Sequence, residues 1–221
     1  ASLIKDADTR RKILDRFVGR STVRIEMPEN MAFQLMAQAM KETSDPVLLP
    51  EWQEDKADLN AELTGVRSTI ISSAKKTATM GDKTIIKDAE LQAIVPIHPY
   101  AALLLKHMSV AFNSNARSMF DFIISNDMTD AKAFKWYINN YGPLDEKNLL
   151  TIDMLWDFFT GADHSGLNDD VRVILDSYNL LKKDSLTPDQ ERIFKTVLLL
   201  EAISVRVGNV ELLRSNEQNI D

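Results

Sequence analysis

The chain has 221 residues, enough for one large domain or two small ones. Its 44% apolar and 27% charged residues are close to the averages of globular proteins, which excludes a fibrous or wholly disordered chain. The net charge is −7. Cysteine is absent, which excludes disulfides, zinc ribbons and thiol catalysis. Only seven glycines and seven prolines occur, which favours long helices.

The charge is distributed unevenly along the chain. Residues 1–24 hold seven basic and three acidic side chains, a net charge of +4, so the other 197 residues carry −11. Such an acidic body is a poor surface for nucleic acid, whose binding depends on neutralised phosphates. The basic residues within 5–24 can contact phosphate, DNA or an acidic neighbouring subunit, or they can form a solvated helix face.

The sequence also bears on location. It contains no apolar run of about 18 residues, the length needed to cross a bilayer, and no hydrophobic segment typical of a secretion signal. The absence of cysteine fits a reducing compartment. We therefore expect a cytoplasmic protein that neither spans a membrane nor is secreted.

The first third of the chain is predicted to be mostly helical. Apolar spacing predicts a helix over residues 8–17. Its apolar side is formed by Ile13, Leu14 and Phe17. Residues 22–27 alternate and contain β-branched side chains, which is typical of a half-buried strand. Pro28 begins a second helix that ends before residue 45, and a longer helical stretch follows over residues 50–80.

The rest of the chain is also predicted to be helical, with one ambiguous stretch. Residues 82–97 do not distinguish a strand from a helix, and a short strand is expected near residues 84–95. Further helices are predicted over residues 98–112, 149–159, 171–181 and 188–207. Two more are predicted between them: one is capped by residues 113–115 and contains the apolar residues within 119–124, and the next contains the apolar residues within 133–138 and stops at 141–143. The fold class is therefore all-α, a helical bundle with one or two short strands. The Gly142-Pro143 turn suggests a seam between residues 1–142 and 143–221.

Common sites for nucleotides, metals and nucleophiles are missing from the sequence. It contains neither GxxxxGK[ST] nor GxGxxG, and its seven glycines are too scattered for a loop that cradles phosphate. His98, His107 and His164 lack the spacing of metal ligands, so capping or half-buried histidines are expected. Asp163-His164-Ser165 cannot form a catalytic triad within one loop. No metal is expected.

The tryptophans and methionines are interpreted mainly as residues that pack in the core or at an interface. Trp52, Trp136 and Trp156 are not interleaved with basic residues as in a base-stacking surface, so core or subunit-interface positions are expected. The nine methionines include a group within residues 27–40 that can form an adaptable protein-binding surface, although core filling is the simpler interpretation.

One combination of motifs resembles a known family. Asp15-Arg16-Phe17, the expected strand over residues 22–27 and the helix opened by Pro28 resemble the end of an AAA+ ATPase core and the start of its helical lid. The resemblance implies that Arg16 is the arginine finger, with Arg20 as a second candidate. An arginine there reaches the nucleotide of the next subunit and stabilises charge on the transferred phosphoryl group.

Three later segments extend the resemblance. Residues 115–120, Asn-Ala-Arg-Ser-Met-Phe, look like the lid helix that presents a sensor arginine, which implies that role for Arg117. Residues 96–100 and 149–159 resemble segments of large bacterial P-loop ATPases, including some of phage-defence systems. The chain departs from the family because Asp15 replaces the usual glycine before Arg-Phe and because the nucleotide-binding core is absent.

The sequence thus predicts a helical lid and C-terminal fragment of a larger P-loop ATPase. Its expected role is to couple the nucleotide state to contacts with other subunits or domains or with an unknown protein partner, through movement of the lid. The fragment alone is not expected to be an enzyme, and ATP and Mg²⁺ would belong to the parent ATPase. The alternative is a self-contained helical adaptor or interaction domain. A metal hydrolase finds no support in three unspaced histidines.

Overall fold

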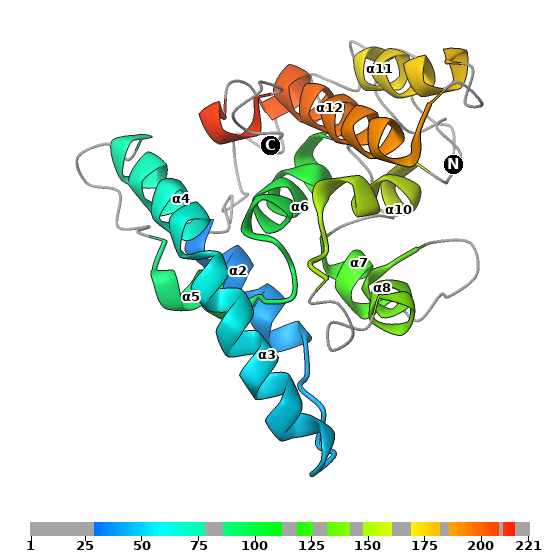
Figure 1. Cartoon of the computed structure of the whole chain (residues 1–221). Coiled ribbons are helices and arrows are strands. Elements are labelled where there is room, and N and C mark those ends of the chain that lie inside the picture. The colour runs from blue at the N-terminus through cyan, green and yellow to red at the C-terminus, as the bar shows by residue number, and fades with distance from the viewer. Residues whose placement is uncertain are drawn as a thin grey trace, which may run out of the picture.

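The fold is known from a computed structural model, which describes residues 29–77, 86–111, 119–125, 132–141, 148–160, 169–181, 186–207 and 210–214. These residues are almost entirely helical (Figure 1), so the all-α prediction is confirmed. The first half contains α2 (Glu29–Ala39), α3 (Leu48–Glu62), α4 (Thr64–Thr77), α5 (Asp88–Ala93) and α6 (Pro99–Ala111). The second half contains α7 (Met119–Ile124), α8 (Phe134–Asn140), η1 (Ile152–Leu155), α10 (Trp156–Thr160), α11 (Asp169–Leu180), α12 (Pro188–Val207) and η4 (Glu211–Leu213).

The strand expected near residues 84–95 is wrong where the structure describes that stretch, because α5 occupies most of it. Lys87 is extended, and its backbone N–H donates to Oε2 of Glu90 at 3.1 Å, which caps the start of α5. Within the described residues the only β contact is one parallel bridge between Ile97 and Leu150. The strand expected over residues 22–27 lies outside the described residues.

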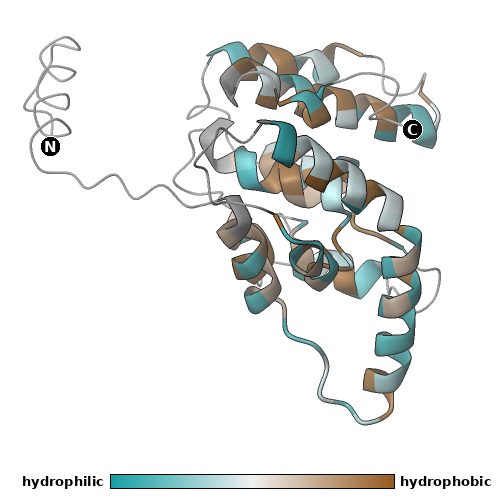
Figure 2. Cartoon of the chain, turned by 90° about the vertical axis from the view of Figure 1, so that its left-hand side faces the viewer, coloured by the Kyte–Doolittle hydropathy of each residue, from teal (hydrophilic) through white to brown (hydrophobic). Residues whose placement is uncertain are grey.

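The helical stretch expected over residues 50–80 consists of two helices, α3 and α4, separated by Leu63. Leu63 is buried, and its backbone N–H bonds to the carbonyl of Leu59, which ends α3. The Thr64 hydroxyl donates to the Ala61 carbonyl at 2.9 Å and so satisfies a carbonyl at the end of α3. The first turns of α3 project away from the rest of the described helices (Figures 1 and 2).

The core is built around α6 and α12. Helix α6 is buried on most of its surface, through Ala101, Ala102, Leu103, Leu104, Leu105 and Met108. It contacts α4, α7, η1 and α12, and α12 in turn contacts α10 and α11. One cluster of buried residues runs from Ala32 to Leu213, so segments on both sides of the Gly142-Pro143 turn contribute to it. The boundary at that turn stays a prediction.

Many of the described helices are amphipathic. Figure 2 shows hydrophobic and hydrophilic residues on the same helices, as expected when one side packs inward. In the part of the chain that the structure describes, no helix is both long and apolar enough to cross a bilayer.

Candidate functional site

The arginines to which the resemblance assigns roles, Arg16, Arg20 and Arg117, lie outside the described residues. The structure does describe α7, which begins at Met119, two residues after Arg117. Met119 and Phe122 are buried, and the ring of Phe122 packs edge-on against Phe158 with centroids 5.2 Å apart. Helix α7 also contacts α2, α6 and α8. The helix that follows Arg117 is therefore firmly anchored in the core.

His98 caps α6, as the sequence analysis expected of a histidine without metal-ligand spacing. Its Nδ1 accepts the backbone N–H of Tyr100 at 3.3 Å, and the two rings stack with centroids 5.7 Å apart. The backbone of His98 donates to the carbonyl of Leu150 at 3.0 Å. Burial lowers the pKa of His98 to about 4, so the imidazole is neutral near pH 7 and keeps its acceptor nitrogen.

Of His164 and the three tryptophans, the structure describes only the tryptophans. His164 lies outside the described residues, and no group of three or more His, Asp or Glu side chains within the described ranges is arranged to hold a metal ion. Trp156 is buried, which agrees with a core position. Trp52 and Trp136 are only partly buried. Trp52 lines the apolar groove described below.

An apolar groove lies between the end of α2, the first turns of α3, the turn before α6, and α8. It has a volume of about 540 Å³. Its apolar lining consists of Ala37, Met40, Leu48, Trp52, Ala93, Val95, Pro96, Phe134 and Ile138. Leu48 is 43% and Ile138 39% exposed, so large apolar side chains at its edge face solvent. Hollows of this size and character commonly bind ligands or partner side chains.

One ion pair forms the polar edge of the groove. Nζ of Lys56 lies 2.6 Å from Oε1 of Glu42, and this hydrogen bond lowers the pKa of the Glu42 carboxyl despite an opposing effect of burial. A second, shallower hollow of about 430 Å³ shares Lys56 and Glu42 and continues toward Asn60 and Gln92. The pair therefore separates an apolar groove from a polar one.

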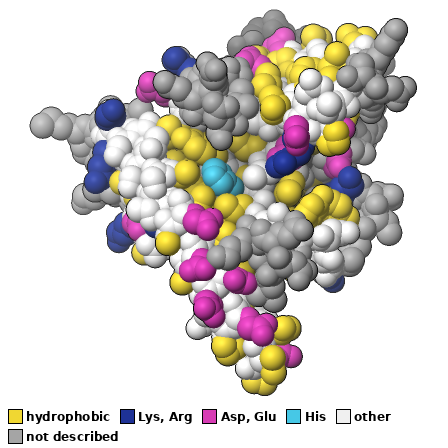
Figure 3. Space-filling model, viewed as in Figure 1, with side chains coloured by type: hydrophobic (Ala, Val, Ile, Leu, Met, Phe, Trp, Pro, Cys, Tyr) yellow, Lys and Arg dark blue, Asp and Glu magenta, His cyan; other side chains and the backbone are white. Residues whose placement is uncertain are grey.

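Acidic side chains follow the outer flank of α3 beside the groove. Glu51, Asp55, Asp58 and Glu62 recur at i, i+4, i+7 and i+11, which places them on one side of a helix. Figure 3 shows acidic side chains one after another along this helix and hydrophobic side chains at its free end. We call these four residues the acidic stripe.

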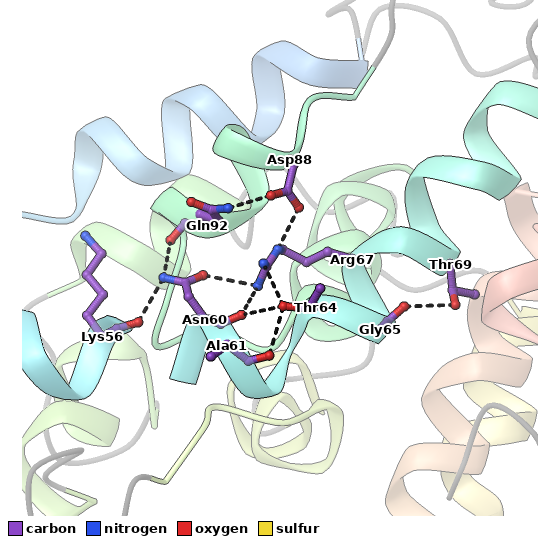
Figure 4. Close-up of polar contacts among 9 residues, drawn as sticks. All are labelled: Lys56, Asn60, Ala61, Thr64, Gly65, Arg67, Thr69, Asp88 and Gln92. Atoms are coloured by element: carbon purple, nitrogen blue, oxygen red, sulfur yellow. Dashed lines mark hydrogen bonds and ion pairs between the residues drawn. The ribbon is translucent and has the colours of Figure 1, made fainter. Parts of the chain in front are cut away.

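A buried arginine holds α3, α4 and α5 together behind the groove (Figure 4). Arg67 is only 4% exposed. Its Nε donates to Oδ1 of Asp88 at 2.7 Å, and Nη1 donates to the carbonyl of Asn60 at 2.5 Å. Nη1 also contacts Oδ1 of Asn60 at 3.3 Å, and Nη2 contacts Oγ1 of Thr64 at 3.4 Å. Because α3 and α5 both line the groove, this network fixes the spacing of two of its walls.

The burial of Arg67 was not predicted from the sequence. An arginine in an amphipathic helix normally extends to solvent, so its type gave no reason to expect burial. The available signal was the i, i+4, i+7 spacing of Asn60, Thr64 and Arg67, which puts three polar groups on one side of a continuous helical stretch. That signal does not identify Asp88, which comes from a separate helix.

A second polar cluster joins α10, α11 and α12 around a hollow of about 310 Å³. The Tyr178 hydroxyl donates to Glu191, whose carboxylate also lies 2.9 Å from Nζ of Lys195. Lys132 pairs with Asp157 across the same hollow at 2.5 Å. Burial, followed by the hydrogen bond to Glu191 and by the negative charges of Glu191 and Asp157, raises the pKa of Tyr178 to about 12. Each charge in this cluster has an opposite charge beside it, which fits a role in linking helices.

Comparison of the chain with protein-family models, with curated proteins and with solved structures finds no match. The similarity to AAA+ ATPases therefore rests on the motifs quoted above.

Proposed function

We propose that this chain is the helical lid and helical extension of a larger P-loop ATPase. In that setting it couples the nucleotide state to contacts with other subunits, domains or a protein partner. ATP and Mg²⁺ would be held by the nucleotide-binding core of the parent, with Arg16 acting on the nucleotide of a neighbouring subunit and Arg117 on the nucleotide beside the lid. The chain by itself would not catalyse hydrolysis.

The observation that supports this proposal is that the segments carrying the resemblance are neighbours in the fold. Helix α2, which directly follows Pro28, contacts α7, which begins two residues after Arg117. Helix α7 also contacts α6, the helix that residues 96–100 open. The bridge between Ile97 and Leu150 joins residues 149–159, the fourth segment of the resemblance, to the residues that precede α6. Close-packed helices transmit small displacements, so a change at one arginine can reach the others.

The test is made in the full polypeptide that contains these residues. Arg16→Ala should reduce ATP turnover by about 10³–10⁵-fold, the contribution of an arginine finger, while ATP binding is retained. Arg117→Ala should also reduce turnover by orders of magnitude. Arg172→Ala is the matched control, because Arg172 is an exposed arginine of α11 whose guanidinium pairs with Asp169, three residues before it on the same helix.

Two results would contradict the proposal. Wild-type turnover in both the Arg16 and Arg117 variants would remove the assigned roles. Specific ATP binding by the 221-residue chain alone would refute the argument that the phosphate-binding elements lie elsewhere.

The second candidate is a self-contained helical interaction domain, which the apolar groove with Leu48 and Ile138 at its edge favours. The gene that encodes the chain distinguishes the two candidate functions. A GxxxxGK[ST] loop encoded upstream of Ala1 supports the ATPase proposal, whereas an initiator codon directly before Ala1 supports the adaptor.

A further inference from the structure

The acidic stripe lies in a strongly charged segment that also forms one wall of the groove. We call residues 41–62 the α3 arm; it contains seven carboxylates and two lysines, a net charge of −5. One lysine, Lys56, is already paired with Glu42. Of the six other carboxylates of the α3 arm, four form the acidic stripe. Charge of one sign on a projecting helix attracts segments of opposite charge over several ångströms.

The apolar half of this surface lies directly beside the charged half. Leu48 and Trp52 line the groove from α3, one turn apart, and Glu51 and Asp55 occupy the neighbouring flank of the same helix. Ile138 faces the groove from α8. A helix that fits here needs large apolar side chains on one side and basic side chains beside them, which is the helix-in-groove mode of recognition.

The chain itself contains a sequence with these properties. Residues 8–17 are predicted to form a helix that has Ile13, Leu14 and Phe17 on one side, and they also contain Arg10, Arg11, Lys12 and Arg16. They belong to the leading 24 residues, whose net charge is +4. The chain thus supplies both an apolar groove flanked by acidic side chains and a basic amphipathic segment.

We propose that the groove and the acidic stripe of one copy bind residues 8–17 of a second copy. The choice of a second copy rests on the proposed function, in which Arg16, a member of this segment, acts on the neighbouring subunit. Because groove and segment are different surfaces, the contact is head-to-tail, and a pair of copies retains a free segment on one copy and a free groove on the other for further copies.

The experiment uses the full 221-residue chain and two charge variants. Glu51→Lys with Glu62→Lys changes the charge of the acidic stripe from −4 to 0, and Arg10→Glu with Arg11→Glu changes the charge of residues 8–17 from +2 to −2. Neither pair includes Arg16. Asp170→Lys with Asp189→Lys is the matched control, since both carboxylates are exposed and lie on α11 and α12. Circular dichroism and thermal melts establish that each variant is folded.

Sedimentation velocity and light scattering without nucleotide give the expected result. Wild type and control should self-associate, more strongly at low salt, and each charge variant should associate at least about tenfold more weakly. The stripe variant loses the charge attraction, and the segment variant replaces it by repulsion. An equimolar mixture of the two variants should form a 1:1 complex, since the intact segment of one meets the intact groove of the other.

The apolar half is tested separately by Ile138→Ser, which should weaken association without changing its salt dependence. A wild type that stays monomeric at all protein and salt concentrations overturns the proposal. This holds also if residues 8–17 bind the groove of their own copy, because the proposal requires a second copy. A mixture that forms no complex also overturns it. These readouts involve no ATP, so their failure is distinct from a failure of the turnover test.

Discussion

Replacing Arg67 by methionine tests whether the buried network behind the groove stabilises the fold. Methionine keeps the apolar stem and removes the guanidinium, so the variant loses the two short hydrogen bonds to Asp88 and to the carbonyl of Asn60, at 2.7 and 2.5 Å. Hydrogen bonds of a charged group contribute about 1.5–3 kcal/mol each. The Asp88 side chain is 49% exposed and water can solvate it, whereas the Asn60 carbonyl loses a partner.

We therefore expect the free energy of unfolding to fall by about 2–4 kcal/mol. For a chain of this size that corresponds to a decrease in Tm of roughly 4–16 °C. Arg67→Lys should have an intermediate effect, because an ammonium group can contact Asp88 but cannot also reproduce the fork toward Asn60.

The assay is urea unfolding followed by circular dichroism, with Arg172→Ala as the control. Arg172 is exposed and pairs with Asp169 three residues away, so its removal should change the free energy of unfolding by less than about 0.5 kcal/mol. An Arg67→Met variant as stable as that control would refute the argument that the network holds α3, α4 and α5 together.

Two further predictions concern stability. Because burial lowers the pKa of His98 from 6.5 to about 4, the unfolded chain takes up a proton between these pH values while the folded chain does not. The free energy of unfolding should fall by up to about 3 kcal/mol as pH drops from 6.5 to 4. The His98→Asn variant should lack this decrease in the free energy of unfolding. A variant with the same pH profile as the wild type would contradict the prediction. Leu104→Ala, at a fully buried position of α6, should cost about 2–5 kcal/mol in urea unfolding, whereas Leu180→Ala, at an 85% exposed position, should cost under about 0.5. Equal losses would contradict the assigned core.

Much of the helical content followed from the sequence because it depends on local patterns. The spacing of leucines after His98 predicted α6, and the Thr187 cap with Pro188 predicted the start of α12. In the structure the Thr187 hydroxyl accepts the backbone N–H of Gln190 and the Gln190 side chain accepts that of Thr187, as in a capping box. Such signals lie within one turn of chain and need no distant partner.

Other features could not be predicted from local patterns. The apolar runs within residues 84–95 are too short to distinguish a strand from a helix by periodicity. In the structure the buried Glu90 stabilises the start of α5, because its carboxylate accepts the backbone N–H of Lys87 and, at 2.6 Å, Nε2–H of Gln34 on α2. The burial of Arg67 depends in the same way on Asp88, 21 residues away. The roles expected of Arg16 and Arg117 stay predictions.

The groove shows most clearly where local information ends. The sequence by itself determined the amphipathic helices, the acidic α3 arm and the basic leading segment, because composition and spacing are properties of contiguous residues. Only the tertiary structure placed Met40, Trp52, Pro96 and Ile138, from four separate segments, around one hollow. The physical reason is that burial of each helix's apolar side requires a partner surface, and the choice of partner depends on the shape of the whole core.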